Sequence, residues 1–160
     1  PETGGLSMKK CILTVAILIV AAANAQQALA HCEVPCGIYA DQRRFEQMLE
    51  DQKTIEKGMV SITELSSESD ALSKNQLTHW VNTKEDHATN TQHIIAQYFM
   101  TQRIKPGTEG YAKKLAAAHA VMVTAMKCKQ TVDPKNAEML RKAILDFYRA
   151  YEGKEPNLEG

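Results

Sequence analysis

The sequence predicts an all-α protein: an up-down four-helix bundle preceded by a short irregular segment. Three observations lead to this prediction. Beyond residue 40, apolar residues recur at spacings of three, four and seven, which is the period of an amphipathic helix. Signals for β-strands are nearly absent from the same region. Short polar or Pro-containing breaks divide the region into four segments, and four amphipathic helices with short connections pack as an up-down bundle.

The first thirty residues have the composition of an export signal. A basic start at Met8-Lys9-Lys10 is followed by an uncharged apolar run over 12–23. Ala28-Leu29-Ala30 then supplies the small-x-small pattern of a signal-peptidase site. The apolar run is shorter than the roughly 20 residues that cross a bilayer, which favours a cleaved signal over a membrane anchor, the alternative.

We therefore expect a leader over 1–30, with a signal peptide over 8–30, and a mature domain over 31–160 that has no membrane segment. Residues 1–7 carry no signal features and are expected to be a misassigned start or an expression remnant. The mature protein is expected to be exported, either to the periplasm or to the medium. In such an oxidising compartment a pair of cysteines forms a disulfide unless a metal holds it.

The first two helices are expected over about 41–66 and about 71–101, separated by a polar break at Ser66–Asp70 that contains capping residues. Gln52 occupies a position in the apolar seam of the first helix. The stripe of the first helix is Phe45, Met48, Ile55, Met59 and Ile62, and that of the second is Leu77, Trp80, Val81, His87, Ile94, Ile95 and Tyr98.

The third helix is expected over about 109–129, after a turn that contains Pro106-Gly107. Asp133-Pro134 is an N-cap followed by Pro at the first position of the fourth helix. The tail from Gly153 onward is polar, and we expect it to be loose. The third stripe is Tyr111, Leu115, Ala118, Met122, Ala125 and Met126, and the fourth is Leu140, Ile144, Phe147 and Tyr151.

Composition excludes several classes of function. The 19 basic and 19 acidic residues give a net charge of zero without a basic block, which is unlike a nucleic-acid-binding protein. Four cysteines are too few for a disulfide scaffold of this size. The methionines fit flexible core filling, and Cys128 a small buried hydrophobe. No histidine has a Glu three residues before it, so a di-iron carboxylate centre is not expected, and we expect no metal site inside the bundle.

Ligand-type residues are concentrated in residues 31–39, which we call the hook. Its sequence is His31-Cys32-Glu33-Val34-Pro35-Cys36-Gly37-Ile38-Tyr39. Cleavage after Ala30 exposes the α-amine of His31 beside its imidazole and the Cys32 thiol. Pro35 and Gly37 allow a tight turn that brings both thiolates to one ion. Two thiolates with two backbone nitrogens form a planar set, which suits Ni(II) or Cu(II) better than zinc. The alternative is a Cys32–Cys36 disulfide.

The hook resembles the N-terminal nickel-binding segment of nickel-containing superoxide dismutases, in which His, Cys, Pro, Cys, Gly and Tyr recur at the same spacing. The four-helix prediction agrees with that family's fold. The resemblance implies disproportionation of superoxide to dioxygen and hydrogen peroxide through a Ni(II)/Ni(III) cycle, with one nickel ion per chain. It implies thiolate ligands from Cys32 and Cys36, and nitrogen ligands from the α-amine of His31 and the amide of Cys32. The His31 imidazole would be the axial ligand of the oxidised metal.

Roles outside the ligand set are also implied by the resemblance. Tyr39 matches the Tyr that lines the approach to the metal, and Glu33 stands where relatives often have Asp. With a one-residue gap, Arg44-Phe45-Glu46 resembles the family's Arg-apolar-Glu segment, in which the Glu orients the His imidazole. The family continues this contact with an Arg on the next helix. This chain has no Arg between Arg44 and Arg103, so that partner is absent or replaced.

The leading hypothesis from the sequence is an exported nickel superoxide dismutase. The resemblance implies a homohexamer whose hooks are supported by neighbouring subunits, and a peptidase that matures the chain. Two other hypotheses stay open. One is an extracytoplasmic bundle that binds nickel or copper without turnover, and the other is a structural bundle with a Cys32–Cys36 disulfide and no metal.

Overall fold

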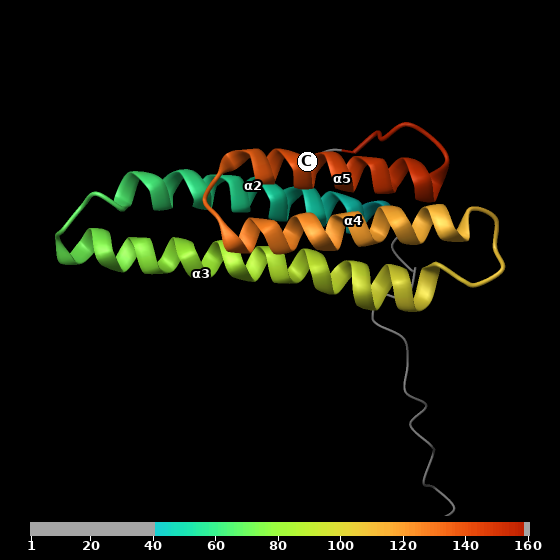
Figure 1. Cartoon of the computed structure of the whole chain (residues 1–160), viewed down its shortest axis with the longest axis horizontal. Helices are drawn as coiled ribbons and strands as arrows, with labels where there is room; N and C mark the ends of the chain where they lie inside the picture. The colour runs from blue at the N-terminus through green and yellow to red at the C-terminus, as the bar shows by residue number, and fades with distance from the viewer. Residues whose placement is uncertain (1–40, 159–160) are drawn as a thin grey trace, which may run out of the picture. The chain divides into compact units, whose positions relative to one another are not determined.

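The computed structural model describes residues 41–158, which form a helical bundle (Figure 1). Its elements are α2 (Gln42–Leu65), α3 (Ala71–His93), η1 (Ile94–Arg103), α4 (Tyr111–Gln130) and α5 (Pro134–Glu152). Because η1 continues α3 without a break, the described chain forms four rods, and no strand occurs within 41–158. The four-helix fold class is confirmed. The predicted signal peptide and the hook lie outside the described residues.

The ends of the helices follow the capping residues that the sequence provides. The Asp70 carboxylate accepts hydrogen bonds from the backbone N–H groups of Leu72 and Ser73, both at 3.0 Å, and so begins α3. Asp133 does the same for Lys135 at 3.1 Å, with Pro134 as the first residue of α5. Gly153 ends α5 with a φ of 71°, a conformation that glycine adopts without a steric penalty.

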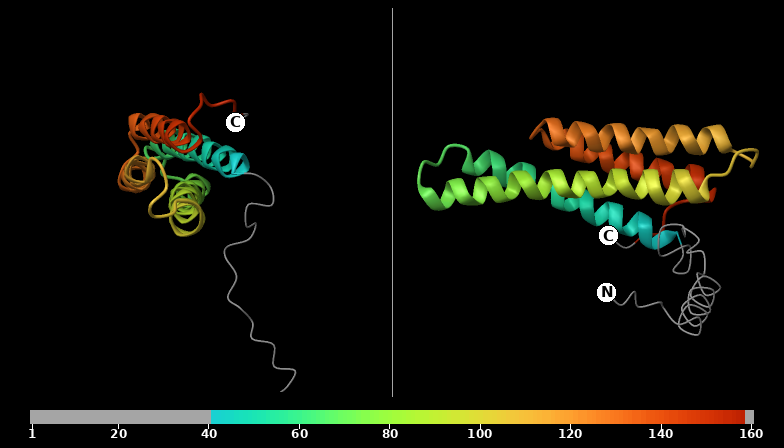
Figure 2. Two further views of the ribbon diagram at one scale, coloured as in Figure 1. Left: turned by 90° about the vertical axis from the view of Figure 1, so that its right-hand side faces the viewer. Right: turned by 90° about the horizontal axis from the view of Figure 1, so that it is seen from below.

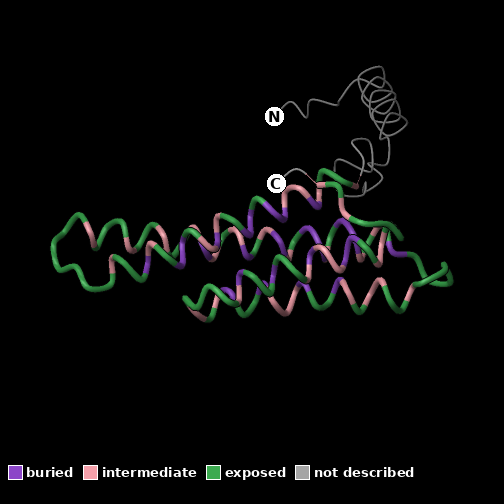
Figure 3. The backbone as a smooth tube through the Cα atoms, turned by 90° about the horizontal axis from the view of Figure 1, so that it is seen from above, coloured by how far each residue is buried: buried purple, intermediate pink, exposed green. Residues whose placement is uncertain are grey.

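The four rods pack as a closed square around one core. α2 contacts α3 and α5, and α4 contacts the same two neighbours (Figure 2). The interior is formed by the apolar stripes, and buried positions recur along the inner side of each rod (Figure 3). Gln52 lies in this seam with a relative exposure of 1%. The fully buried residues include Phe45, Met48, Ile55, Met59, Ile95, Phe99, Val121, Leu140, Ile144 and Phe147.

Two predicted core positions are wrong, because Val81 is 37% exposed and Met126 is 41% exposed. The end of α2 and the beginning of α3 extend beyond the α4–α5 pair, so fewer helices are available there to cover apolar side chains (Figures 1 and 2). Met126 follows buried Ala125 by one residue, which turns it by about 100° from the core face of α4. The buried face of α4 is instead Ala118, Val121, Ala125 and Cys128.

The C-terminal tail differs from the loose segment that the sequence predicts. Leu158 packs against the core as a partly buried residue. Gln42 donates a 3.4 Å hydrogen bond from Nε2 to the backbone oxygen of Asn157, and Glu155 pairs with Arg149 at 2.9 Å. The tail therefore folds back along the start of α2. Within the described residues no helix is sufficiently long and apolar to cross a membrane.

Candidate metal centre

Most residues predicted to form the metal centre belong to the hook: His31, Cys32, Pro35, Cys36, Gly37 and Tyr39 all lie outside the described residues. Glu46 is described, on the second turn of α2. The structure therefore describes the chain from Asp41 onward, which follows the hook by two residues in the sequence. Within residues 41–158, no group of three or more His, Cys, Asp or Glu side chains is placed to hold a metal ion.

Glu46 and Arg44 flank Phe45, which is fully buried. The Gln42 amide donates a 2.9 Å hydrogen bond to Glu46 Oε1. Arg44 donates one of 2.8 Å to Gln47 Oε1, and its guanidinium lies 5.2 Å from the centre of the Tyr98 ring. The Arg44-Phe45-Glu46 segment thus places two charged groups at the start of α2, held by an aromatic anchor in the core.

The Asp41 carboxylate, at the same end of the bundle, accepts four hydrogen bonds from side chains. Oδ1 accepts a 2.5 Å hydrogen bond from the Tyr98 hydroxyl, and Oδ2 accepts one of 2.6 Å from the Tyr151 hydroxyl. Arg103 donates two more to Oδ2, from Nη2 at 2.8 Å and from Nε at 3.2 Å. We call Asp41, Tyr98, Arg103 and Tyr151 the Asp41 cluster. It joins the start of α2 to η1 and α5.

The electrostatics of the cluster favour an ionised carboxylate. Burial of Asp41 opposes its ionisation, but the hydrogen bonds from Arg103, Tyr151 and Tyr98 together outweigh burial and hold the pKa of Asp41 below its usual range. Burial and the bond to Asp41 raise the pKa of Tyr98 to about 12. The same two causes raise the pKa of Tyr151. At neutral pH both tyrosines are therefore neutral donors to an anion.

The π-helical register of η1 explains how one carboxylate contacts both Tyr98 and Arg103. Residues five apart on an α-helix point about 140° away from each other. In η1 the backbone bonds span five residues, as in the 2.8 Å bond from the Ile104 N–H to the Phe99 carbonyl. This spacing stacks residues five apart on one side of the rod. Tyr98 and Arg103 consequently face Asp41 together.

Aromatic rings form a rigid base beneath the Asp41 cluster. Phe45 lies 4.8 Å from Phe99 and 5.2 Å from Phe147 between ring centres, and Phe99 lies 5.2 Å from Tyr151. Tilted and edge-on pairs at such distances are favourable beyond the area they bury. Tyr151 belongs to both groups, since its ring packs in this base while its hydroxyl binds Asp41.

Two further buried charges serve to join the rods. Asp51 on α2 accepts hydrogen bonds from His87 Nδ1 and Asn90 Nδ2, both at 2.7 Å, and burial outweighs these bonds and raises the pKa of Asp51. Lys84 on α3 donates from Nζ to the carbonyls of Cys128 at 2.9 Å and Lys129 at 2.7 Å. Cys128 is fully buried, as predicted for a structural cysteine.

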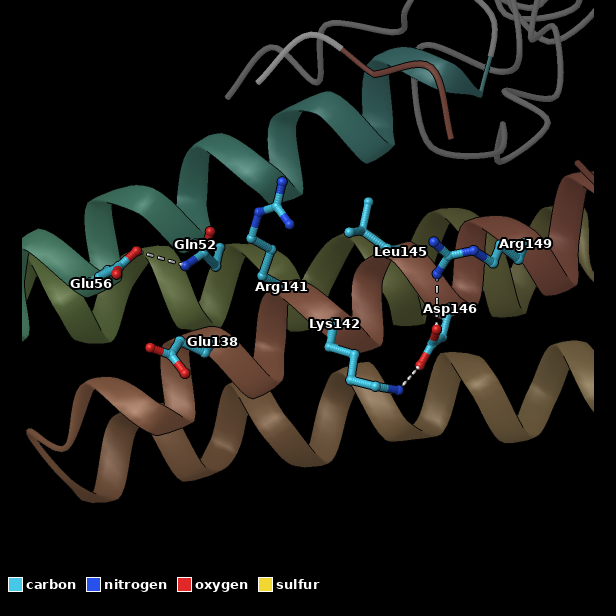
Figure 4. A pocket seen from close by; sticks show the side chains of 8 residues that line it. All are labelled: Gln52, Glu56, Glu138, Arg141, Lys142, Leu145, Asp146 and Arg149. Carbon is cyan, nitrogen blue, oxygen red and sulfur yellow. Dashed lines mark hydrogen bonds and ion pairs between the residues drawn. The ribbon is translucent and has the colours of Figure 1, made fainter. Parts of the chain in front are cut away.

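A charged groove of about 470 Å³ lies between α2 and α5 (Figure 4). Arg141 extends from α5 toward α2 in this view. Asp146 pairs with Lys142 at 2.6 Å and with Arg149 at 3.0 Å, and buried Gln52 donates to Glu56 at 3.1 Å. The groove thus carries charges of both signs, several of them paired, and we assign it no role in the metal centre.

Sequence reasoning did not identify Asp41, Arg103 or the Tyr151 hydroxyl as a cluster. Asp41 appears there only as the first residue of the expected range of the first helix, and Tyr151 as a core residue of the fourth. The sequence did offer a signal. Asp41 lies between the hook and the first apolar stripe, and the stripes of the second and fourth helices each contain a Tyr. These residues lie 57, 62 and 110 positions from Asp41, a separation that periodicity cannot connect.

The described fold is that of a small helical-bundle protein whose ligand-type residues precede its first described helix. The model of the nickel-containing superoxide dismutase family matches residues 26–155, which include the hook and the four rods. The chain belongs to this family. It is therefore an oxidoreductase that acts on superoxide and uses nickel as its cofactor. Comparison with curated proteins and with solved structures gave no significant match.

Proposed function

We propose that the mature chain begins at His31 and holds one nickel ion in the hook, where it disproportionates superoxide outside the cytoplasm. The observation that carries this proposal is the family match over 26–155, because it includes a hook whose six family residue types stand at the family's spacing. The domain division follows: a leader over 1–30, then one domain over 31–160 that comprises the hook and the bundle.

The donor chemistry of the hook fits nickel. Cys32 and Cys36 offer two anionic sulfurs, and the α-amine of His31 with the amide of Cys32 offers two nitrogens. Such a tetragonal set suits Ni(II), and anionic donors stabilise the higher oxidation state of a metal. When bound, nickel supplies the one-electron Ni(II)/Ni(III) couple through which one superoxide is oxidised to dioxygen and the next is reduced to hydrogen peroxide.

The remaining hook residues have supporting roles in this proposal. Pro35 and Gly37 would allow the turning of the chain that brings the two thiolates to one ion. Tyr39 would line the approach of superoxide and order water or the incoming anion. The imidazole of His31 would be a further ligand of the metal. Two protons are taken up from solvent for each hydrogen peroxide formed.

Glu46 is proposed to orient the His31 imidazole through a hydrogen bond. Its carboxylate is half-buried on the second turn of α2 and already bonds Gln42, which limits its rotamers. Among the guanidinium groups described at this end, Arg44 bonds Gln47 and lies over the Tyr98 ring, and Arg103 bonds Asp41. Arg103 lies on η1, at the end of the second rod. We therefore propose that Arg103, acting through its bond to Asp41, takes the role of the Arg that the family has on its second helix.

A hook of nine residues has few contacts of its own with which to hold a geometry. We therefore propose that the bundle and a homohexameric assembly support it, and that a peptidase exposes His31. Export to the periplasm or the medium follows from the leader. The compartment and the peptidase are to be established by sequencing the N-terminus of the protein recovered from each cell fraction.

The decisive experiment is superoxide decay after pulse radiolysis, with protein that begins at His31 and carries one nickel per chain. We expect catalytic decay that is lost in Cys32→Ser and Cys36→Ser. One extra residue before His31 should abolish activity, because it removes the α-amine ligand. Activity in that extended chain contradicts α-amine ligation. Nickel binding without catalytic decay in the wild type instead favours the second candidate, a bundle that binds nickel or copper without turnover.

A further inference from the structure

We propose that Asp41 is a positioning residue for the hook: its carboxylate, clamped by Tyr98, Arg103 and Tyr151, fixes the place and direction in which the hook leaves the bundle. The inference rests on the proposed function of residues 31–39. It concerns a residue that belongs to neither the ligand set nor the Arg44-Phe45-Glu46 segment.

The side chain of Asp41 is used for tertiary contacts rather than for capping. Asp is among the preferred N-cap residues, and its side chain normally accepts a hydrogen bond from the first turn of the helix. At Asp41 the side chain makes no such bond. All four of its hydrogen bonds come from η1 and α5. The first turn of α2 thus lacks a side-chain cap, and the residue directly before it is attached to two other rods instead.

The backbone of Asp41 is held as well. Its carbonyl accepts hydrogen bonds from the N–H groups of Arg44 at 3.0 Å and Phe45 at 3.4 Å. Phe45 is locked in the aromatic base, and Arg44 lies over the Tyr98 ring. Both the carboxylate and the peptide unit of Asp41 are therefore fixed relative to the core, which leaves this residue little freedom to rotate.

The short chain between Asp41 and the hook limits how far the hook residues can lie from Asp41. Consecutive Cα atoms are about 3.8 Å apart, so the Cα of Tyr39 lies within about 8 Å of the Cα of Asp41. Cys36 is five residues away, which limits its Cα to within about 18 Å. Ligands that must be held to within about 0.5 Å depend on such an anchor, because a short loop is less precise than the helices that support it.

The charge of the clamp adds to the geometric argument. The Asp41 side chain is 9% exposed, and an ionised carboxylate at that depth is tolerated because Arg103 and two hydroxyls satisfy it. Removing the charge leaves the Arg103 guanidinium without its anion. Removing one hydroxyl by Tyr151→Phe leaves the charge in place and loosens a single bond. Removing the Asp41 charge and removing the Tyr151 hydroxyl therefore disturb the Asp41 cluster to different degrees.

The test measures nickel binding and the electron paramagnetic resonance spectrum of the oxidised centre. Both are compared between the wild type that begins at His31 and three variants: Asp41→Asn, Tyr151→Phe and Asp51→Asn. Asp51→Asn is the matched control, since Asp51 is also a buried carboxylate with three hydrogen-bond donors but joins α2 to the last turns of α3, away from the Asp41 cluster's own contacts. Unfolding in urea is measured for each variant.

We expect Asp41→Asn to weaken nickel binding by about tenfold and to alter the spectrum, as loss of an outer-shell partner commonly does. Tyr151→Phe should have a smaller effect in the same direction. Because it removes only one hydrogen bond, it provides a folded variant for the comparison if Asp41→Asn does not fold. Asp51→Asn should leave nickel affinity and the spectrum unchanged, whatever its effect on the unfolding midpoint. An unaltered spectrum and affinity in a folded Asp41 or Tyr151 variant overturns the inference, as does an equal change in Asp51→Asn.

The same measurements separate this inference from the proposed function. A wild-type chain beginning at His31 that binds no nickel through Cys32 and Cys36 refutes the proposed function itself. A wild type that binds nickel normally, beside folded Asp41 and Tyr151 variants that are indistinguishable from it, refutes only the positioning role of Asp41.

Discussion

The Tyr151 hydroxyl donates a 2.6 Å hydrogen bond to Asp41 Oδ2, which joins the last turn of α5 to the residue directly before α2. The two residues are 110 positions apart in the chain. Tyr98 and Arg103 bind the same carboxylate from η1, so three rods meet at one side chain. This end of the bundle is consequently held both by apolar packing and by a charge.

The pH dependence of stability should report the Asp41 clamp. The folded-state pKa of Asp41 lies below the ordinary value of 3.8. A carboxyl whose pKa is lowered on folding adds stability above its unfolded pKa and loses it as the pH falls through the folded pKa. We expect Asp41→Asn to lower the unfolding free energy by about 2 kcal/mol at neutral pH, within the range for bonds to a charged group. The difference from the wild type should shrink below about pH 4.

Urea unfolding of both proteins at about pH 7 and about pH 3 measures this difference. Asp146→Asn is a suitable control, because Asp146 pairs with Lys142 and Arg149 on the exposed face of α5. Its substitution should cost less than about 1 kcal/mol, as for other surface pairs. A cost for Asp41→Asn that does not change with pH would show that the ionised carboxylate is not the stabilising form.

Lys84 should be important for stability rather than for activity. Its ammonium group is buried and satisfies two carbonyls in the last turn of α4, which would otherwise lack partners. Lys84→Met should destabilise the bundle by about 2 kcal/mol, because buried acceptors left without a donor are costly. The control is Lys127→Met, an exposed change in the same turn. Equal unfolding midpoints for the two variants would contradict this role.

The reactivity of the thiols should separate Cys128 from the hook. Cys128 is fully buried, and burial raises the pKa of its thiol to about 11, so it holds little of the reactive thiolate at neutral pH. In reduced, nickel-free mature protein we expect Cys32 and Cys36 to react quickly with a thiol reagent and Cys128 only after denaturation. Cys128→Ala identifies the slow thiol. If the native protein shows no fast thiol until reductant is added, a Cys32–Cys36 disulfide is present.

Removal of nickel should leave the bundle folded. Its core is continuous over residues 45–148, and the described residues contain no cluster able to hold a metal. A chelator should therefore abolish activity while the far-ultraviolet circular dichroism and the unfolding midpoint change little, in contrast to small domains that fold only around their metal. Cooperative loss of helicity on chelation would show that the bundle depends on the metal for its fold.

Local patterns in the sequence account for much of the fold. The expected ranges of the first three helices differ from the observed ones by only a few residues, the fourth begins at Pro134 as expected, and the caps at Asp70 and Asp133 are where composition predicts them. Periodicity and capping act within one or two turns, so they can be read along the chain. The family resemblance was also available, because the hook motif is contiguous and the family match includes it.

Positions that depend on neighbouring rods were predicted less well. Val81 and Met126 have the spacing of core residues, yet their exposure depends on how the neighbouring rods cover α3 and on which face of α4 turns inward. The π register of η1 was not foreseen either, since the same residues read as a continuous α-helix. Whether the backbone hydrogen bonds of a helix span four or five residues depends on packing and not on composition.

The sequence by itself determined the helices, their order and the hook motif, because each depends on residues close together in the chain. The tertiary structure alone decided that Asp41, Tyr98, Arg103 and Tyr151 form one cluster. The contacts of a buried carboxylate depend on which side chains the packed rods bring within about 3 Å of it, and that distance is set by the whole bundle.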